Sequence, residues 1–214
     1  MEILDFILHI DKYLAILIEN YGTFVYLLLF FIIFSETGFV ITPFLPGDSL
    51  LFVLGSFSAV NLLDIKILYP LLLSAAILGN IVNFFIGYYF GEKILRNGKL
   101  IKKEYIEETE KFFQKHGGKA VIISRFLPIF RTFVPFVAGI GKMDTHKFML
   151  YNFIGGFSWI TFFLLLGYFT GNIPFIKDNI THFIYAIIVL SFLPMLIKAI
   201  KKWFTRGYFH LLHL

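Results

Sequence analysis

Long apolar stretches alternate with short polar segments along the chain. Uninterrupted apolar runs cover about Tyr21–Ser35, Ile67–Gly91, Lys147–Gly171 and Phe183–Ile200, and a short amphipathic start, Phe6–Ile18, precedes the first run. A helix of roughly 20 apolar residues is long enough to cross the hydrocarbon core of a bilayer. The pattern therefore predicts several membrane-crossing helices.

Two further hydrophobic stretches, residues 37–63 and 119–141, are interrupted by helix breakers. The breakers are prolines and glycines, namely Pro43, Pro46 and Gly47 in the first stretch and Pro128, Pro135 and Gly139 in the second. Irregular backbone at membrane depth is tolerated only where it is buried in protein or lines a cavity. We therefore predict two re-entrant hairpins in place of two further crossings.

The distribution of basic residues orients the segments. Between Glu92 and Gly118 the chain carries seven Lys/Arg and five Glu, and the tail (198–214) is also basic. Within the first of these segments, four residues recur at helical spacing: Ile101, Tyr105, Thr109 and Phe112. This spacing predicts an amphipathic helix on the membrane surface. The alternative is a charge-rich site for a partner. Because Lys/Arg-rich loops face the cytoplasm, both segments and the N-terminus are predicted to be cytoplasmic.

This topology brings the two broken segments in from opposite faces, as in inverted-repeat transporters. Sequence identity between the two halves is negligible, so the symmetry rests on hydropathy and breakers alone. The predicted fold class is an all-α integral membrane protein, a polytopic helical bundle that forms a single domain over residues 1–214.

Composition supports a chain whose solvent is mainly lipid. Hydrophobic residues make up 58% and charged residues 15% of the chain, and the mean hydropathy is +0.79. The net charge of +5 follows the positive-inside bias and does not suggest a nucleic-acid partner. The chain has no cysteine, and its histidines show no paired spacing on a helix, so neither a metal site nor a cofactor is expected. The N-terminus lacks the features of a cleaved signal peptide.

Away from their ends, the apolar stretches contain four charged residues: Glu36, Asp48, Arg125 and Arg131. Each charge at the centre of a membrane helix costs about 2.5–3.5 kcal/mol on insertion scales. The four charges sum to zero and all lie beside helix breakers, which favours one shared polar site. A purely structural ion-pair network is the alternative.

Chemistry suggests a role for each charge. Arginine binds phosphate oxygens in a bidentate manner, and a turn at Pro128 could bring Arg125 and Arg131 onto one ligand. A desolvated carboxylate favours its protonated form, which makes Glu36 and Asp48 candidate proton or cation sites. A helix N-cap is the alternative for Asp48. Two asparagines of the apolar helix 67–91 could line a cavity or form interhelical hydrogen bonds, namely Asn80 and Asn83.

These residues resemble those of a known family. The stretch Glu36–Asp48 (ETGFVITPFLPGD) resembles the first signature of the DedA family of membrane proteins, and Gly118–Gly139 (GKAVIISRFLPIFRTFVPFVAG) resembles the second. The resemblance extends over about residues 15–200. Further positions that fit the family pattern are Gly79, Gly87, Gly91, Asn152, Gly155 and Trp159.

The resemblance implies a lipid translocase with two opposed re-entrant hairpins that moves polyprenyl phosphate or phospholipids. It also implies coupling to protons or sodium, with Glu36 and Asp48 in the coupling role and Arg125 and Arg131 at the lipid headgroup. The family usually has Asp where this chain has Asn80, a departure that argues against a proton-relay role for that helix.

The leading hypothesis is a transporter that recycles undecaprenyl phosphate across a bacterial cytoplasmic (inner) membrane. A phosphatidylethanolamine flippase or a scramblase is the alternative within the same class, and a structural or stress-response membrane protein is the alternative of another class. A lipid phosphatase is disfavoured because no histidine lies within a hydrophobic stretch and Ser158 lacks the surroundings of a serine nucleophile. Glycine steps such as Gly87-x-x-x-Gly91 permit a homodimer without requiring one.

Overall fold

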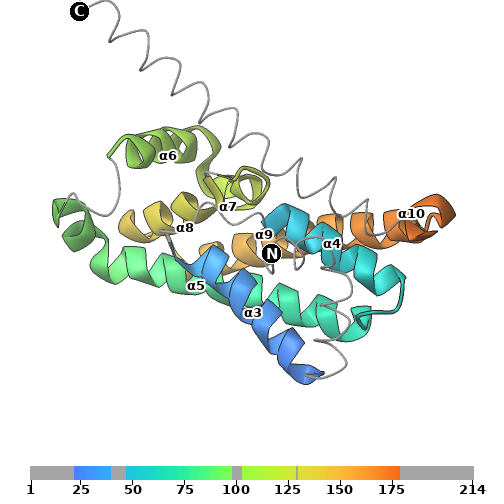
Figure 1. Cartoon of the computed structure of the whole chain (residues 1–214). Coiled ribbons are helices and arrows are strands. Elements are labelled where there is room, and N and C mark those ends of the chain that lie inside the picture. Colours follow the sequence, from blue (N-terminus) through green and yellow to red (C-terminus); the bar gives the residue numbers. More distant parts are fainter. Residues whose placement is uncertain (1–21, 40–46, 98–102, 129, 179–214) are drawn as a thin grey trace, which may run out of the picture.

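The structure, a computed structural model, describes residues 22–39, 47–97, 103–128 and 130–178. All regular secondary structure within these ranges is helical (Figure 1). The helices are α3 (Thr23–Gly38), α4 (Gly47–Ala59), α5 (Ile65–Asn97), α6 (Lys103–His116), α7 (Ala120–Ile123), α8 (Phe130–Ile140), α9 (Thr145–Gly171) and α10 (Pro174–Asp178), with 3-10 turns η1 (Gly117–Lys119) and η2 (Ser124–Phe126) beside α7.

Two long helices, α5 and α9, form the frame of the molecule. They contain 33 and 27 residues, which corresponds to lengths of about 50 and 40 Å. Within the described part of the chain, the portions Ile65–Gly91 and Thr145–Gly171 are the two helices long and apolar enough to cross a membrane. Helix α5 continues six residues beyond the predicted end at Gly91, into the polar segment.

Helix α3, which leads into the first broken segment, packs against the N-terminal half of α5. The backbone N–H of Asp64, just before α5, donates a 2.8 Å hydrogen bond to the Tyr26 hydroxyl near the start of α3. Gly38, at the end of α3, lies against the backbone of Gly79 in the middle of α5. Helix α4 then leads back to the same end, where it stops at Ala59. Helices α3 and α4 are therefore the two limbs of one hairpin.

This arrangement moves the first limb upstream of the predicted boundary. Thr37 belongs to α3, because no helix breaker occurs before Pro43 and the helix continues through Gly38. The described part of the stretch Tyr21–Ser35 forms most of α3, and its crossing of the membrane stays a prediction. Pro43 and Pro46 lie outside the described residues.

The second broken segment approaches from the other end of the long helices (Figure 1). Gly118 lies against Tyr151 near the start of α9, and the Arg125 side chain lies against Gly155 in its middle. Pro128 forms an exposed turn, after which α8 returns along α5 until Ile140 contacts Gly91. Pro135 and Gly139 are buried within α8.

Each hairpin is clamped to a long helix by the same glycine contacts. Helix α4 crosses α9, and α8 crosses α5, so closely that a Cβ on a glycine of either helix would overlap a backbone carbonyl of its partner. The four contacts follow one rule. In each helix, the carbonyl that the partner's Cβ would overlap belongs to the residue three positions before the glycine of that same helix. The contacts are Gly55 with Leu164, Gly167 with Phe52, Gly87 with Phe136, and Gly139 with Phe84. Small residues permit such close helix approach, and the two crossings are built alike.

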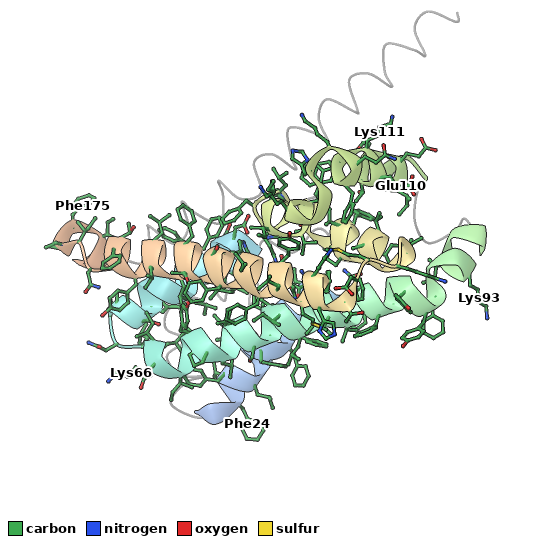
Figure 2. All side chains as sticks on the ribbon, turned by 180° about the vertical axis from the view of Figure 1, so that it is seen from behind. Phe24, Lys66, Lys93, Glu110, Lys111 and Phe175 are labelled. Carbon is green, nitrogen blue, oxygen red and sulfur yellow. The ribbon has the colours of Figure 1, made fainter. Side chains whose placement is uncertain are left out.

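Helix α6 packs on the second hairpin. Ile106 and Thr109 are buried, and the Phe112 ring stacks on Phe130 of α8 with 4.6 Å between ring centroids. Glu110 and Lys111 point outward (Figure 2). The apolar side of the predicted amphipathic helix is therefore covered at least partly by protein, and its contact with a membrane surface stays a prediction.

The long helices expose many large apolar side chains (Figure 2), as expected for surfaces that face lipid. Examples are Leu78, Tyr89, Phe153, Phe162 and Phe169. The predicted amphipathic start Phe6–Ile18, the span Phe183–Ile200 and the basic tail lie outside the described residues.

Candidate functional site

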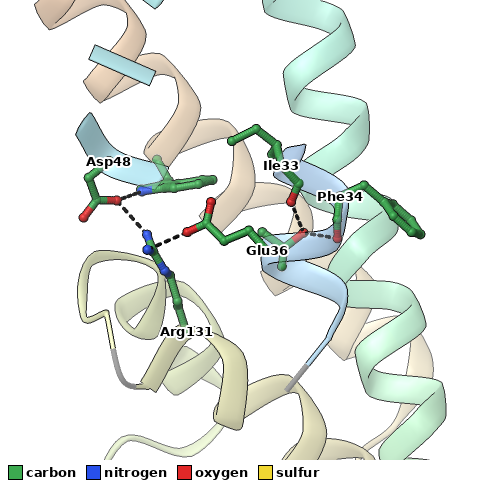
Figure 3. A network of polar contacts seen from close by, with 7 residues as sticks. Ile33, Phe34, Glu36, Asp48 and Arg131 are labelled. Carbon is green, nitrogen blue, oxygen red and sulfur yellow. Dashed lines mark hydrogen bonds and ion pairs between the residues drawn. The ribbon is translucent and has the colours of Figure 1, made fainter. Parts of the chain in front are cut away.

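Three of the four predicted charges meet where the two hairpins converge (Figure 3). Nη2 of Arg131 lies 2.6 Å from Oε1 of Glu36, and Nη1 lies 2.7 Å from Oδ1 of Asp48. The side chains of Arg131 and Glu36 are 5% and 1% exposed, whereas Asp48 is 28% exposed. One guanidinium from the second hairpin therefore holds two carboxylates from the first.

Local helix geometry favours this arrangement. Asp48 is the second residue of α4 and Arg131 is the second residue of α8, so the amino ends of two short helices lie near the network. Helix amino ends carry partial positive charge and attract anions. The Glu36 carboxylate occupies the place where a Cβ of residue 47 would lie, and only glycine leaves that space open. Gly47 therefore has a specific role at the site.

Arg125 is placed differently, among neutral oxygens. Its Nη2 donates to the Ala76 carbonyl (3.0 Å) and to Oδ1 of Asn152 (2.7 Å). The Asn80 amide, oriented so that its oxygen faces the guanidinium, accepts from Nε at 3.2 Å and from Nη2 at 2.9 Å. Asn152 is fixed in turn by donating to the Ile77 carbonyl at 3.0 Å. Arg125 thus connects α5 to α9, and within the described residues no carboxylate pairs with it.

A buried tryptophan links the two arginines. The Cζ atoms of Arg125 and Arg131 lie 5.8 Å and 5.5 Å from the ring centre of Trp159, within the range of cation–π attraction. The indole N–H of Trp159 donates to Oδ1 of Asp48 at 2.8 Å. All four predicted charges therefore belong to one connected site, with Trp159 at its centre.

Asn83 joins the helices behind the site. Its Nδ2 donates to the carbonyls of Thr37 (3.2 Å) and Thr132 (2.8 Å), the residues that follow Glu36 and Arg131. Of the two roles considered for this residue, interhelical hydrogen bonding is the one that the structure shows. It stabilises the α3–α5–α8 junction that presents Glu36 to Arg131.

Two residues of the site, Asn152 and Trp159, were singled out only by family resemblance. They are seven positions apart, which is nearly two helical turns, so both face the same side of α9. Asn152 and Trp159 could have been identified from the sequence by one signal: an asparagine and a tryptophan on the same face of an otherwise apolar helix. No group of three His, Cys, Asp or Glu side chains able to hold a metal occurs among the described residues.

Together the fold and the site define the class of protein to which the chain belongs. The chain is a helical membrane protein in which two broken helical segments meet at a buried network of opposite charges. Comparison with known proteins identifies the family of this chain. The VTT domain matches residues 45–169, more than half of the chain.

Several curated relatives cover most of the chain. Protein DedA of Escherichia coli K12 is 49% identical over 203 residues, which is 93% of each chain. An uncharacterized membrane protein of Mycobacterium leprae is 38% identical over 170 residues, 78% of this chain and 76% of its own. Inner membrane protein YghB of Salmonella typhimurium is 32% identical over 187 residues, 83% and 85% of the two chains. This chain belongs to the DedA family of VTT-domain membrane proteins. No solved structure matches it.

Proposed function

We propose that this protein moves a phosphate-bearing lipid, with undecaprenyl phosphate as the first candidate, across the bacterial inner membrane, driven by protons or sodium ions. The observation that carries the proposal is the double engagement of Arg131, whose two terminal nitrogens each hold a carboxylate oxygen. A phosphate group offers oxygens at a comparable spacing and can replace both carboxylates on the same guanidinium. In this view Glu36 and Asp48 occupy the anion positions in the absence of a lipid.

We assign direct contact with the headgroup to Arg131 before Arg125. Exchange of carboxylate oxygens for phosphate oxygens leaves Arg131 paired throughout. Arg125 would instead have to give up neutral oxygens of Ala76, Asn80 and Asn152. Its buried charge supports the site through Trp159, which it shares with Arg131.

The same exchange supplies a means of coupling. A buried carboxylate that loses its cation is costly unless it gains a proton or a small cation. When a phosphate group binds Arg131, Glu36 and Asp48 lose their cation. Each carboxylate then gains by taking up a proton or a small cation, so lipid binding favours ion uptake. Release of the ion on the other side of the membrane would restore the carboxylates to Arg131 and expel the lipid.

The packing supports alternation between the two faces. We propose that the hairpins are re-entrant and that they open the site to opposite faces, with both termini of the chain in the cytoplasm. Helix α4 crosses α9, and α8 crosses α5, through the same kind of glycine contacts. This similarity supports an inverted repeat. The contact of Arg131 with Asp48 then crosses from the α8–α5 pair to the α4–α9 pair. We propose no chemical reaction on the lipid.

The test is transbilayer movement of undecaprenyl phosphate and of phosphatidylethanolamine in proteoliposomes, with and without a proton or sodium gradient. We expect gradient-dependent movement of undecaprenyl phosphate that is lost in Arg131→Ala and Glu36→Gln. Lys115→Ala, a change of an exposed residue on α6, is the matched control and should behave like wild type. Equal, gradient-independent movement of both lipids would identify a scramblase. No movement by correctly folded protein would favour a structural role.

A further inference from the structure

Asp48 accepts two hydrogen bonds at the same oxygen. Its Oδ1 lies 2.7 Å from Nη1 of Arg131 and 2.8 Å from Nε1 of Trp159. The two donors differ in kind: one is a charged group on a long, jointed side chain, whereas the other is a neutral N–H on a rigid ring. Trp159 is fully buried, in a cluster that includes Leu51 and Leu164. The indole therefore has little freedom to move with either partner.

We infer that Trp159 is a positioning residue that retains Asp48 while a phosphate group replaces this carboxylate on Arg131. The inference rests on the proposed function and deepens it by adding the residue that makes the exchange reversible. Asp48 is only partly exposed, and a partly buried carboxylate that loses all its hydrogen-bond donors is disfavoured. Because the indole N–H remains after Arg131 leaves, Asp48 keeps one hydrogen bond and stays in place to recover the guanidinium.

The indole ring supports Arg131 during the same exchange. The ring centre lies 5.5 Å from Cζ of Arg131, and this cation–π contact does not occupy the N–H groups that bind oxygens. The guanidinium can therefore change its anionic partner without leaving the ring. Trp159 acts on both partners of the ion pair, and its role differs from that of a large side chain that only fills the core.

Substitution with phenylalanine separates these roles, because it keeps an aromatic ring and removes the N–H. In Trp159→Phe, Asp48 still accepts a hydrogen bond from Arg131 before the phosphate binds. Once the phosphate has taken Arg131, neither of the two donors to Asp48 remains. Binding of the phosphate group should therefore weaken. Hydrogen bonds to charged groups are stronger than those between neutral groups, so the dissociation constant should rise by about tenfold, which corresponds to about 1.4 kcal/mol.

The experiment measures equilibrium binding of undecaprenyl phosphate to the purified full-length protein in detergent, with inorganic phosphate as a parallel ligand. Trp159→Phe should weaken binding about tenfold in the presence of Asp48 and have little effect in an Asp48→Asn background, where the side chain that accepts from the indole carries no charge. Trp203→Phe, the same chemical change at the other tryptophan of the chain, should bind like wild type. The same Trp159 effect with inorganic phosphate alone would support the role but identify free phosphate as the ligand.

Three outcomes would overturn the inference. Equal affinity of wild type and Trp159→Phe would exclude the positioning role while leaving the proposed function intact. Equal weakening by Trp159→Phe with and without the Asp48→Asn change would show that Trp159 acts only through packing. Absence of binding to wild type would refute the proposed function and this inference together.

A second measurement does not require a variant at position 159. In Trp203→Phe the only tryptophan left is Trp159, so its fluorescence reports directly on the site. Addition of undecaprenyl phosphate should change the emission of Trp159, because Arg131 and Asp48 separate beside the ring. Saturating binding with no change in emission would contradict the inference even if Trp159→Phe does not fold.

Discussion

Removal of the Arg131 charge should destabilise the protein through the carboxylates that it leaves behind. In Arg131→Gln, Glu36 and Asp48 would remain in the same buried region without the guanidinium that now lies 2.6 and 2.7 Å from them. Asp48 is partly exposed and keeps the Trp159 N–H, whereas Glu36 is 1% exposed. Glu36 should therefore account for most of the loss.

The expected magnitude follows from the burial of the pair. Loss of one partner of a buried ion pair costs about 3–5 kcal/mol, because it strands an uncompensated charge. Neutralising the stranded group should recover a large part of this loss, so Arg131→Gln combined with Glu36→Gln should be more stable than Arg131→Gln alone. For a chain of this size, a loss of that magnitude lowers the melting temperature by about 10 °C.

The assay is the thermal loss of the monodisperse peak in size-exclusion chromatography of the solubilised protein. Arg125→Gln is the matched control: it also removes a buried guanidinium, but its hydrogen-bond acceptors are neutral oxygens of Ala76 and Asn152. Glu36→Gln should not rescue Arg125→Gln to the same extent. The reasoning is refuted if Arg131→Gln melts like wild type, or if Glu36→Gln rescues both arginine variants equally.

Three further predictions concern packing, Arg125 and topology. Gly55→Ala should lower stability by about 1–3 kcal/mol in the same thermal assay, because the new Cβ meets the Leu164 carbonyl, whereas Gly141→Ala, with ordinary contacts only, should be neutral. Asn80→Leu should cost about 1–3 kcal/mol by removing an acceptor from Arg125, and Asn80→Asp should melt near wild type. Because the chain lacks cysteine, single cysteines report topology directly. Lys66→Cys should react with an impermeant maleimide on intact cells and Lys111→Cys only after lysis; the reverse result would invert the proposed topology.

Much of the site could be predicted from the chain because charge is rare within its apolar stretches. The cost of isolated charges in lipid is large enough that Glu36, Asp48 and Arg131 had to find partners, and the structure brings them together. The same argument predicted one shared polar site but did not specify the partner of each charge. The partners of Arg125 are neutral amide and carbonyl oxygens in place of a carboxylate.

Other features depend on contacts that hydropathy does not encode. Hydropathy does not state how α3 lies against the other helices, because residues 24–34 are apolar and unbroken whether they cross the membrane or form one limb of a hairpin. The position of α3 along α5 comes from the Tyr26–Asp64 contact and from Gly38 against Gly79. The central position of Trp159 likewise requires α4, α8 and α9 to be placed together, and no local pattern states that.

The charges of the site are divided between the two hairpins, so each hairpin compensates the charge of the other. The first hairpin carries two carboxylates and the second carries two guanidiniums, so each segment alone would hold uncompensated like charges. Contact between Arg131 and the carboxylates removes that cost, and Trp159 places a neutral surface beside both arginines. An anion that takes Arg131 reverses the same balance and leaves the carboxylates without their cation. Under the proposed function, lipid binding, ion uptake and separation of the hairpins are one coupled event, and coupling of this kind is the property that a transporter needs.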